Sequence, residues 1–519
     1  MTVTPEDEPF FSQQWYLENT GQTGGTPGVD INVRPAWELA TGAGVSIAIN
    51  DTGVSTTFQD LSANYDASRS GNFVPGSTRT DGGPTTPDAW HGTGVATLAA
   101  AADTTSGFIG AAPEATIASL AHLQANTTRS EDINAFLNAV REYDKFDVVN
   151  SSWQWTEIFV DDFNVPEFSQ HGNEIRRAAE DGRNDLGTIM VFAAGNDFSA
   201  TNFFGLKEYG VDNSNYHNFQ NSRFTISVGA TNDEGTFSAP NDILGFTQPG
   251  SPNLVSAPGT GILTIDLAGS LGNSAGDTTT VNGTSFSAPL VSGVTALMLD
   301  VNPDLGWRDV QEILAYTAEQ NHIAQSAWQF NGAENWNGGG LHTNFNYGFG
   351  AVNAGAAVRL AQAWDETDTS SNEASASAVN NQTATISNSL PEIRQTVSIT
   401  QDVEIENVAI DVVLEHADIG DLAMTLTSPS GTTSTLVKTP GAGDLGAGRT
   451  AEEGFRLTSN EFWGEESGGI WTLSVFDSEP LDDGLLSGWQ LTTYGSTPNA
   501  DDTYVYTDEY ARSFPGSRQ

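Results

Sequence analysis

The chain has 519 residues, of which 38% are hydrophobic and 16% are charged, with 54 glycines and 21 prolines. This composition is globular and rich in loops, and it excludes a long helical bundle, which needs roughly half of its residues to be A, E, K, L or R. The net charge of −47 disfavours binding to nucleic acid or to anionic membranes, and the absence of cysteine excludes disulfides and thiolate zinc sites.

Hydropathy and the N-terminus bear on where the protein acts. The sequence has no run of about 18 apolar residues, so we expect no membrane span. The N-terminus, MTVTPEDEPFFSQQWYL, has acidic flanks and no basic-then-apolar region, so no standard signal peptide is expected. In a secreted protein without cysteine, calcium bound by oxygen ligands would have to replace disulfides as the stabilising cross-link.

Residues 1–365 alternate apolar runs with helical patterns. Five apolar runs predict buried strands, at 45–51, 115–120, 146–152, 187–196 and 224–230. Helical patterns over 130–143 and 174–182 lie between some of these runs. Apolar strands separated by helices predict an α/β fold with a mostly parallel sheet covered on both faces. In such sheets the chemistry collects at the carboxyl ends of the strands.

The composition changes after residue 365. Residues 366–385 are acidic and rich in Ser, Thr and Asn, which predicts a linker. From residue 386 to 496, short alternating strands separated by turn signals predict an antiparallel β-sandwich. Residues 497–519 predict a polar tail. The sequence therefore indicates a large α/β domain followed by a smaller all-β domain.

Three motifs supply the residues of an activated serine. Asp51 ends an apolar strand in D-T-G, His91 opens the small-residue helix H-G-T-G-V-A, and Ser285 lies at a helix N-terminus in G-T-S-F-S-A-P. A serine hydroxyl needs a neutral imidazole to take its proton, and a buried carboxylate fixes the imidazole tautomer. Asn196, at the end of the run FAAGN, would hydrogen-bond the oxyanion together with the helix N-terminus at Ser285.

These motifs, in this order, resemble those of the subtilisin family of serine endopeptidases. Other segments narrow the resemblance to the kexin/furin (proprotein convertase) branch, namely SQQWYLENTG (12–21), NYHNFQNSRFTISVGA (215–230) and LGWRDVQEILAYTA (305–318). Residues 386–496 are similar to the P/Homo B domain of that branch. The resemblance implies an endopeptidase with Asp51, His91 and Ser285 as its triad and Asn196 in its oxyanion hole.

The resemblance also implies a specificity pocket between two strand ends. The expected substrate-binding residues are Ser151, Ser152, Trp153, Ala193, Ala194, Gly195 and His217.

The branch selects paired basic residues through acidic groups, and several of these groups are replaced here. Thr52 stands where a second Asp follows the catalytic one, Gln154 and Trp155 replace Gly-Pro, and His217 replaces a pocket Asp. Specificity for paired basic residues is therefore not implied. Three other acids could supply charge: Asp161, Asp162 and Asp212.

Calcium is implied on two grounds. A cysteine-free, acidic chain suits hard cations, which are held by cages of oxygen ligands. By resemblance, the strong calcium site combines a carboxylate after the first strand, the loop 102–108 and an acid near the N-terminus. The expected metal ligands are Asp60, Glu8, Asp103 and Thr104.

The sequence therefore predicts a monomeric, calcium-stabilised serine endopeptidase that acts on protein or peptide substrates, with protein or proprotein processing as one role. An N-terminal propeptide would serve as folding aid and inhibitor. The expected location is secreted, cell-surface or periplasmic. Two alternatives remain open: a broad-specificity degradative extracellular subtilase, and a catalytically idle adhesion or binding protein. A peptide-library cleavage profile would distinguish a broad-specificity protease from one that processes proteins at basic residues. Hydrolysis of casein would distinguish an active protease from an idle binding protein.

Overall fold

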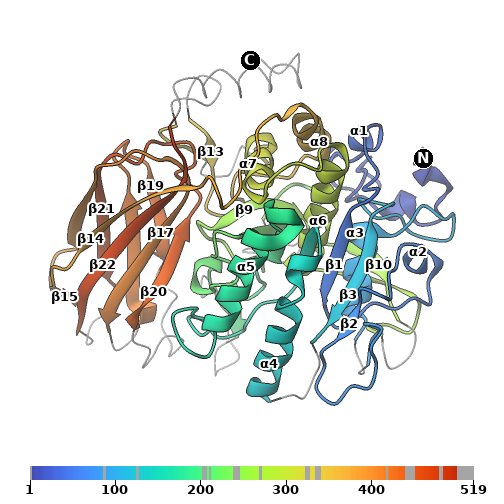
Figure 1. Cartoon of the computed structure of the whole chain (residues 1–519), viewed down its shortest axis with the longest axis horizontal. Coiled ribbons are helices and arrows are strands. Elements are labelled where there is room, and N and C mark those ends of the chain that lie inside the picture. The colour runs from blue at the N-terminus through green and yellow to red at the C-terminus, as the bar shows by residue number, and fades with distance from the viewer. Residues whose placement is uncertain are drawn as a thin grey trace.

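The computed structural model describes most of the chain and shows two structural parts (Figure 1). The α/β part lies to the right in Figure 1, and the all-β part lies to the left. The described residues are 3–85, 89–123, 128–201, 207–209, 212–237, 246–267, 272–321, 328–333, 340–416, 419–438, 451–478 and 483–498.

A seven-stranded sheet forms the centre of the larger domain. Its order is β2-β3-β1-β4-β5-β8-β9, and every neighbouring pair is parallel. The strands are β1 Ser46–Asp51, β2 Gly71–Asn72, β3 Thr116–Ala121, β4 Val148–Ser151, β5 Ile189–Ala193, β8 Thr225–Thr231 and β9 Asn253–Pro258. All five predicted strands are confirmed. β1, β4, β5 and β8 are buried along their whole length, which explains their continuous apolar sequences.

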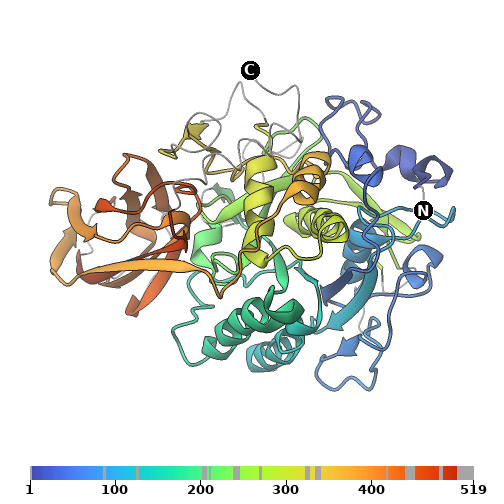
Figure 2. The ribbon, with the colours of Figure 1, turned by 45° about the horizontal axis from the view of Figure 1, so that its top comes forward.

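Helices cover both faces of this sheet. α4 (Arg129–Val140) and α5 (Ser169–Asp185) pack together on one side (Figure 2), and α3 (His91–Ala100) and α6 (Thr284–Val301) pack against the strands from the other. Among the described helices, α6 alone is long and apolar enough to cross a membrane. However, 89% of that stretch is buried inside the molecule, so its hydropathy is accounted for by the core.

The remaining elements of this domain are short or peripheral. The helices are α1 Arg34–Trp37, α2 Gln59–Ser62, α7 Trp307–Thr317 and α8 Ala354–Ala363. The strands outside the main sheet are β6 Ser199–Thr201, β7 Lys207–Tyr209, β10 Ile262–Ile265, β11 Thr278–Val281, β12 Gln329–Phe330 and β13 His342–Thr343.

The smaller domain is the predicted antiparallel β-sandwich. One sheet has the order β14-β22-β17-β20 with β15 on β22, and the other has the order β16-β21-β18-β19. The strands are β14 Ala374–Asn380, β15 Ala384–Ser387, β16 Ile393–Ile399, β17 Glu404–Glu415, β18 Leu422–Thr427, β19 Thr433–Lys438, β20 Ala451–Ser459, β21 Gly469–Asp477 and β22 Asp483–Ser496. Ile410 and Leu491 of the first sheet share one core with Leu426 and Leu473 of the second.

The predicted linker, residues 366–385, contains a strand. β14 pairs with β22 along its whole length, from Ala374 with Gly495 to Asn380 with Trp489. Its sequence, ASASAVN, consists mostly of small residues on an edge strand, so it lacks the bulky apolar alternation that marks a strand. A linker over the whole of 366–385 is therefore wrong. From residue 499 onward, the predicted tail lies outside the described residues.

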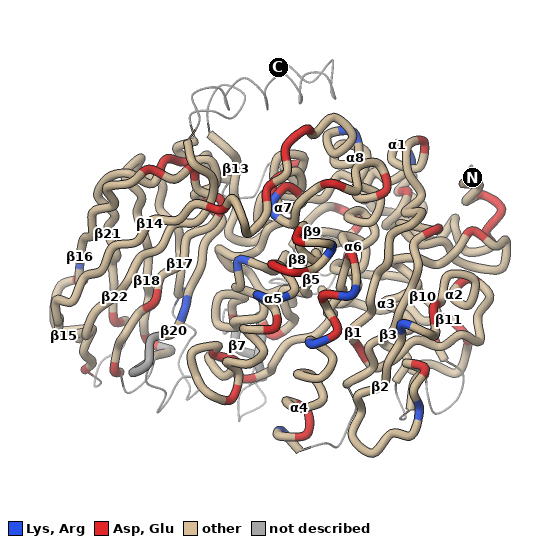
Figure 3. The backbone as a smooth tube through the Cα atoms, viewed as in Figure 1, with Lys and Arg blue, Asp and Glu red and all other residues tan. Residues whose placement is uncertain are grey.

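Acidic residues are distributed over both domains. Figure 3 shows Asp and Glu along most elements, with few Lys and Arg between them. The acidic residues, 66 against 19 basic ones, are thus spread along the chain in both domains.

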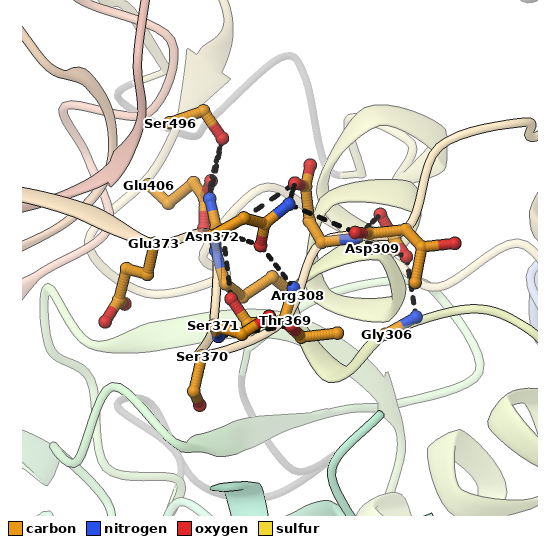
Figure 4. Close-up of polar contacts among 12 residues, drawn as sticks. Gly306, Arg308, Asp309, Thr369, Ser370, Ser371, Asn372, Glu373, Glu406 and Ser496 are labelled. Carbon is orange, nitrogen blue, oxygen red and sulfur yellow. Dashed lines mark hydrogen bonds and ion pairs between the residues drawn. The ribbon is translucent and has the colours of Figure 1, made fainter. Parts of the chain in front are cut away.

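A buried arginine joins the two domains (Figure 4). Arg308, in α7, is 1% exposed. Its Nε donates to Glu406 Oε2 at 2.7 Å, and its Nη2 donates to Ser496 Oγ at 2.6 Å. Its Nη1 donates to the Thr369 carbonyl oxygen and to Asn372 Oδ1, each at 3.1 Å. Arg308 therefore ties the larger domain to the segment after α8 and to two strands of the sandwich.

Apolar contacts and hydrogen bonds extend the same interface. Tyr216 and Ile158 of the larger domain are buried within the hydrophobic core of the sandwich. Asn215 Nδ2 donates to the carbonyl oxygens of Leu436 at 3.2 Å and Thr458 at 3.0 Å. The sandwich is therefore packed firmly onto the larger domain.

Candidate active site

Asp51 and His91 form a hydrogen-bonded pair at the carboxyl end of β1. Asp51 is fully buried, and His91 Nδ1 lies 2.9 Å from both of its carboxylate oxygens. The Gly92 N–H donates to Thr52 Oγ1 at 2.9 Å, which holds the start of α3 against the end of β1. A Cβ on Gly92 would lie 2.7 Å from the Gly53 carbonyl oxygen, so only glycine allows this approach.

This pairing sets the charge state of His91. Burial lowers the pKa of His91, but the charge and the hydrogen bond of Asp51 outweigh it, so the pKa lies above its usual value. The side chain of His91 is 24% exposed. An imidazole anchored through Nδ1 leaves its Nε2 as the nitrogen that can exchange a proton with a neighbouring group.

Ser285 lies at the N-terminus of α6, against the end of β4. Its Oγ donates to the Ser152 carbonyl oxygen at 3.0 Å, and Ser152 Oγ donates back to the Ser285 carbonyl oxygen at 2.8 Å. The neighbouring Phe286 ring lies 5.5 Å from the His91 ring, so the first turn of α6 contacts His91. In this structure the Ser285 hydroxyl is hydrogen-bonded to Ser152, and the bond from a catalytic hydroxyl to its base often tightens only when substrate binds.

Asn196 is exposed just beyond the end of β5. Its Oδ1 accepts hydrogen bonds from the Thr284 N–H at 2.9 Å and from Thr284 Oγ1 at 3.0 Å. Because the carbonyl end of this amide is held, its Nδ2 is the end left to donate. Asn196 therefore presents a donor beside Ser285, as an oxyanion site requires.

Of the seven expected pocket residues, all except His217 lie at two neighbouring strand ends. Ser151, Ser152 and Trp153 follow the course of β4, and Ala193, Ala194 and Gly195 follow that of β5, which pairs with β4. Gln220 Nε2 bridges the two ends, donating to the Trp153 carbonyl oxygen at 3.1 Å and to the Ala193 carbonyl oxygen at 3.2 Å. The structure thus brings these two groups together beside Ser285.

His217 does not line this surface. It is fully buried, with Nε2 3.1 Å from Asp212 Oδ1 and Nδ1 3.4 Å from Asp161 Oδ1. Burial lowers the pKa of His217, but Asp212 and Asp161 raise it to about 10, so His217 carries a charge at neutral pH. The expected contact of His217 with substrate is wrong because its ring is enclosed between two carboxylates.

The expected calcium ligand Glu8 faces hydrogen-bond donors. Glu8 Oε1 accepts from the N–H groups of Thr104 at 2.6 Å and Thr105 at 2.5 Å, and Oε2 accepts from the Gly107 N–H at 2.8 Å. Calcium would need carbonyl oxygens in this loop, whereas the loop turns its N–H groups toward the carboxylate.

The other expected calcium ligands are engaged in the same way. Asp60 accepts from the Thr104 hydroxyl and from the Phe108 N–H, the latter at 3.0 Å. Asp103 Oδ2 accepts from the Thr4 N–H at 2.8 Å. In the described part of the chain, no group of three or more His, Asp or Glu is placed to hold a metal ion. Glu8, Asp60 and Thr104 come together as expected, but this arrangement does not fit calcium.

The sequence analysis gives Gln154 no role at the site and does not name Gln248, although both side chains lie there. Gln154 Nε2 donates to Asp197 Oδ2 at 2.7 Å. Gln248 is fully buried, and its N–H donates to the Gly195 carbonyl oxygen at 3.1 Å. Gln154 could have been found from its replacement of a glycine after Ser-Trp. Gln248 lies in no motif, so nothing in the sequence pointed to it.

Fold and site together define the class, a subtilisin-like protein with a C-terminal β-sandwich. The sequence matches the Subtilase family over residues 42–350 and the Proprotein convertase P-domain over residues 405–493. The chain therefore belongs to the subtilase family, and the predicted resemblance is confirmed.

The similar proteins include a solved structure and curated relatives. The crystal structure of the Aeromonas sobria serine protease with its chaperone has a TM-score of 0.80 and 26% identity, and the match covers 95% of this chain and 96% of that one. Neuroendocrine convertase 2 of Drosophila melanogaster is 32% identical, with 94% of this chain and 72% of the relative covered. PC3-like endoprotease variant B of Hydra vulgaris is 33% identical over 92% of this chain. The chain spans 64% of the length of that variant and 58% of variant A.

Proposed function

We propose that the chain is a serine endopeptidase that hydrolyses peptide bonds in protein substrates. The observation that carries the proposal is the Asp51–His91 pair, which lies next to the α6 N-terminus that bears Ser285. The similarity to a serine protease and to convertases supports the same activity.

In the proposed first step, Ser285 Oγ attacks the carbonyl carbon of the scissile bond while His91 Nε2 takes the hydroxyl proton. Buried Asp51 holds the imidazole by Nδ1 and stabilises the imidazolium that forms. His91 then gives this proton to the leaving amine, and the acyl group remains on Ser285. In the second step, a water molecule gives a proton to His91 and attacks the ester carbon. The bond from this carbon to Ser285 Oγ then breaks, and His91 returns the proton to Oγ, which frees the acid product and restores the hydroxyl.

The negative charge that develops on the carbonyl oxygen is placed between two donors, Asn196 Nδ2 and the Ser285 N–H. The N-terminus of α6 adds the positive end of its dipole. Loss of one oxyanion donor costs about 2.7–4 kcal/mol of transition-state stabilisation in comparable sites, so Asn196 is the most important group after the triad.

The substrates in this proposal are proteins, including precursor proteins, because several similar proteins are named convertases, one of them a proprotein convertase. A secreted, cell-surface or periplasmic location and an inhibitory propeptide complete the proposal. No step of the mechanism requires a metal ion.

The test is labelling by a serine-directed fluorophosphonate. We expect the wild type to be labelled and Ser285→Ala to remain unlabelled with an unchanged circular dichroism spectrum. Ser287→Ala, in the same helical turn, is the control and should still be labelled, because its Oγ is buried and donates to the Ala257 carbonyl oxygen at 3.0 Å. Equal labelling of wild type and Ser285→Ala would refute the assignment of the nucleophile.

A further inference from the structure

The side chain next to the scissile bond has to fit between the two strand ends at the active site. Ser285 Oγ donates to the carbonyl group of Ser152, and Asn196 accepts from the N–H of Thr284, the residue before Ser285. With a substrate carbonyl group held between Ser285 and Asn196, as in the proposed mechanism, the side chain of its own residue would face the strand ends at 152–154 and 193–195, which Gln220 bridges. The space between these two strand ends is called the side-chain gap below.

The side chain of Gln154 crosses the side-chain gap. A Cβ placed on Gly195 would lie 1.8 Å from Gln154 Oε1 and 1.4 Å from Gln248 Oε1, so both amides lie directly against the Gly195 backbone. Gln154 belongs to the opposite strand end. Its amide Nε2 is anchored to Asp197 Oδ2 at 2.7 Å, which holds the side chain across the gap.

The walls of the gap are polar and incompletely hydrogen-bonded. Gln154 Oε1, Gln220 Oε1 and both polar atoms of the Gln248 side chain are buried without a hydrogen-bond partner. Gln220 and Gln248 are at most 1% exposed. A large apolar side chain forced among these atoms would keep them unpaired, which is unfavourable, whereas a small residue leaves room for water to bond them.

We propose that Gln154 determines specificity and restricts the residue on the acyl side of the scissile bond to small side chains such as Gly, Ala and Ser. This inference rests on the proposed endopeptidase function. A Leu, Phe or Arg side chain enters the gap only if Gln154 leaves Asp197. The chain thus selects substrates by a side chain of its own that partly fills the pocket.

The experiment compares peptides that differ only in this residue: Ala, Ser, Leu, Phe or Arg. We expect the wild type to show kcat/KM values for Ala and Ser at least about 10-fold above those for the others, because a single methylene group already changes kcat/KM by about 10- to 200-fold in a tight pocket. In Gln154→Gly, the kcat/KM for Leu and Phe relative to Ala should rise by about 10- to 100-fold. Gln382→Gly, in an exposed loop of the sandwich, should keep the wild-type pattern.

A second variant covers a failure of Gln154→Gly to fold. Asp197→Ala removes the carboxylate that anchors Gln154 and should shift the pattern in the same direction by a smaller factor. Wild-type cleavage after Phe or Arg as fast as after Ala, or variants that keep the wild-type pattern, would overturn the inference. Fluorophosphonate labelling distinguishes a failure of the proposed function from a failure of this inference. An unlabelled wild type contradicts the endopeptidase function, whereas a labelled enzyme whose variants keep the wild-type pattern contradicts only the role of Gln154.

Discussion

At the residue scale, two histidines of the same domain are both paired with carboxylates but are suited to different roles. His91 and His217 are both raised in pKa by carboxylates, against the effect of burial. His91 remains partly exposed and has to lose its proton to act as a base. His217 is enclosed by Asp161 and Asp212 and is charged at neutral pH. The same chemistry thus provides a catalytic base in one place and a fixed internal cation in the other.

Asp51→Asn tests the first of these roles. We expect kcat to fall by about 10⁴-fold, because the asparagine amide can donate to Nδ1 and so favours the wrong tautomer. The neutral imidazole is the active form, so the acid limb of kcat/KM for the wild type should lie above pH 6.5, the usual pKa of His. Without the charge of Asp51, burial alone acts on the pKa of His91, and the limb of the residual activity should move to lower pH. An unchanged limb would contradict the pairing.

His217→Asn tests the second role. The folded-state pKa of about 10 exceeds the unfolded value of about 6.5, so the ion pair contributes fully below pH 6.5 and its contribution is lost as the pH rises to about 10. We expect the variant to lose about 3–5 kcal/mol of unfolding free energy at pH 6.5, because two carboxylates are left without their cation. The loss should shrink toward pH 10. Urea denaturation in a Ser285→Ala background avoids autolysis.

The control for this experiment is His171→Asn. His171 is also buried, with Nε2 3.0 Å from the Ile133 carbonyl oxygen, but burial lowers its pKa to about 4. It is therefore essentially neutral between about pH 7.5 and 10 in both the folded and the unfolded state. Its effect on stability should be constant over this range, and parallel pH profiles for the two variants would refute the charged state of His217.

At the scale of secondary structure, the predictable elements are those with strong local patterns. The strands of the parallel sheet are buried on both faces and show as continuous apolar runs. The sequence of β14 does not predict a strand, because an edge strand of small residues has no such pattern and its partner β22 lies more than 100 residues further along the chain.

The residues of the site also fall into those that a local sequence pattern predicts and those that it does not. The motifs locate Asp51, His91, Ser285 and Asn196, since each depends on its immediate sequence neighbours. The side chain of Gln248 in the side-chain gap depends on which loops meet in the folded chain, so no local pattern reports it. The donor-lined loop at Glu8 is a third case, because a sequence does not show whether a loop turns N–H or C=O groups toward a carboxylate.

Glu8→Gln tests whether the hydrogen bonds to the Glu8 carboxylate stabilise the loop 102–108. An amide at Glu8 presents an NH₂ group to backbone N–H groups, so we expect a loss of about 1.5–3 kcal/mol and a lower Tm. The Glu8 oxygens accept hydrogen bonds from backbone N–H groups and so are not expected to bind calcium. Calcium added after chelation should therefore shift the Tm of the wild type and of the variant equally. Glu6→Gln, at an exposed ion pair with Arg34, is the control and should change stability by less than about 1 kcal/mol. A calcium response that is lost only in Glu8→Gln would restore the predicted calcium site.

At the scale of the whole molecule, the two domains must stay together despite a net charge of −47, which repels acidic surfaces from one another. Arg308 lies where the larger domain, the segment after α8 and the sandwich converge (Figure 4). It is the cation that faces three acidic side chains at this interface: Glu406, Asp368 and Glu373. We infer that this arginine couples the unfolding of the two domains.

Arg308→Met is the corresponding prediction. It leaves the Glu406 carboxylate, which is 12% exposed, without its cation, and we expect a loss of about 3–5 kcal/mol with separate unfolding of the two domains by calorimetry. The double variant Arg308→Met/Glu406→Leu removes both charges and should recover most of the loss, because an apolar pair can replace a buried ion pair. Arg394→Met, whose partner Glu392 lies on the sandwich surface, should change stability by less than about 1 kcal/mol. Equal melting curves for Arg308→Met and Arg394→Met would contradict the coupling, since they would show that the sandwich is held by its apolar contacts with Tyr216 and its neighbours alone.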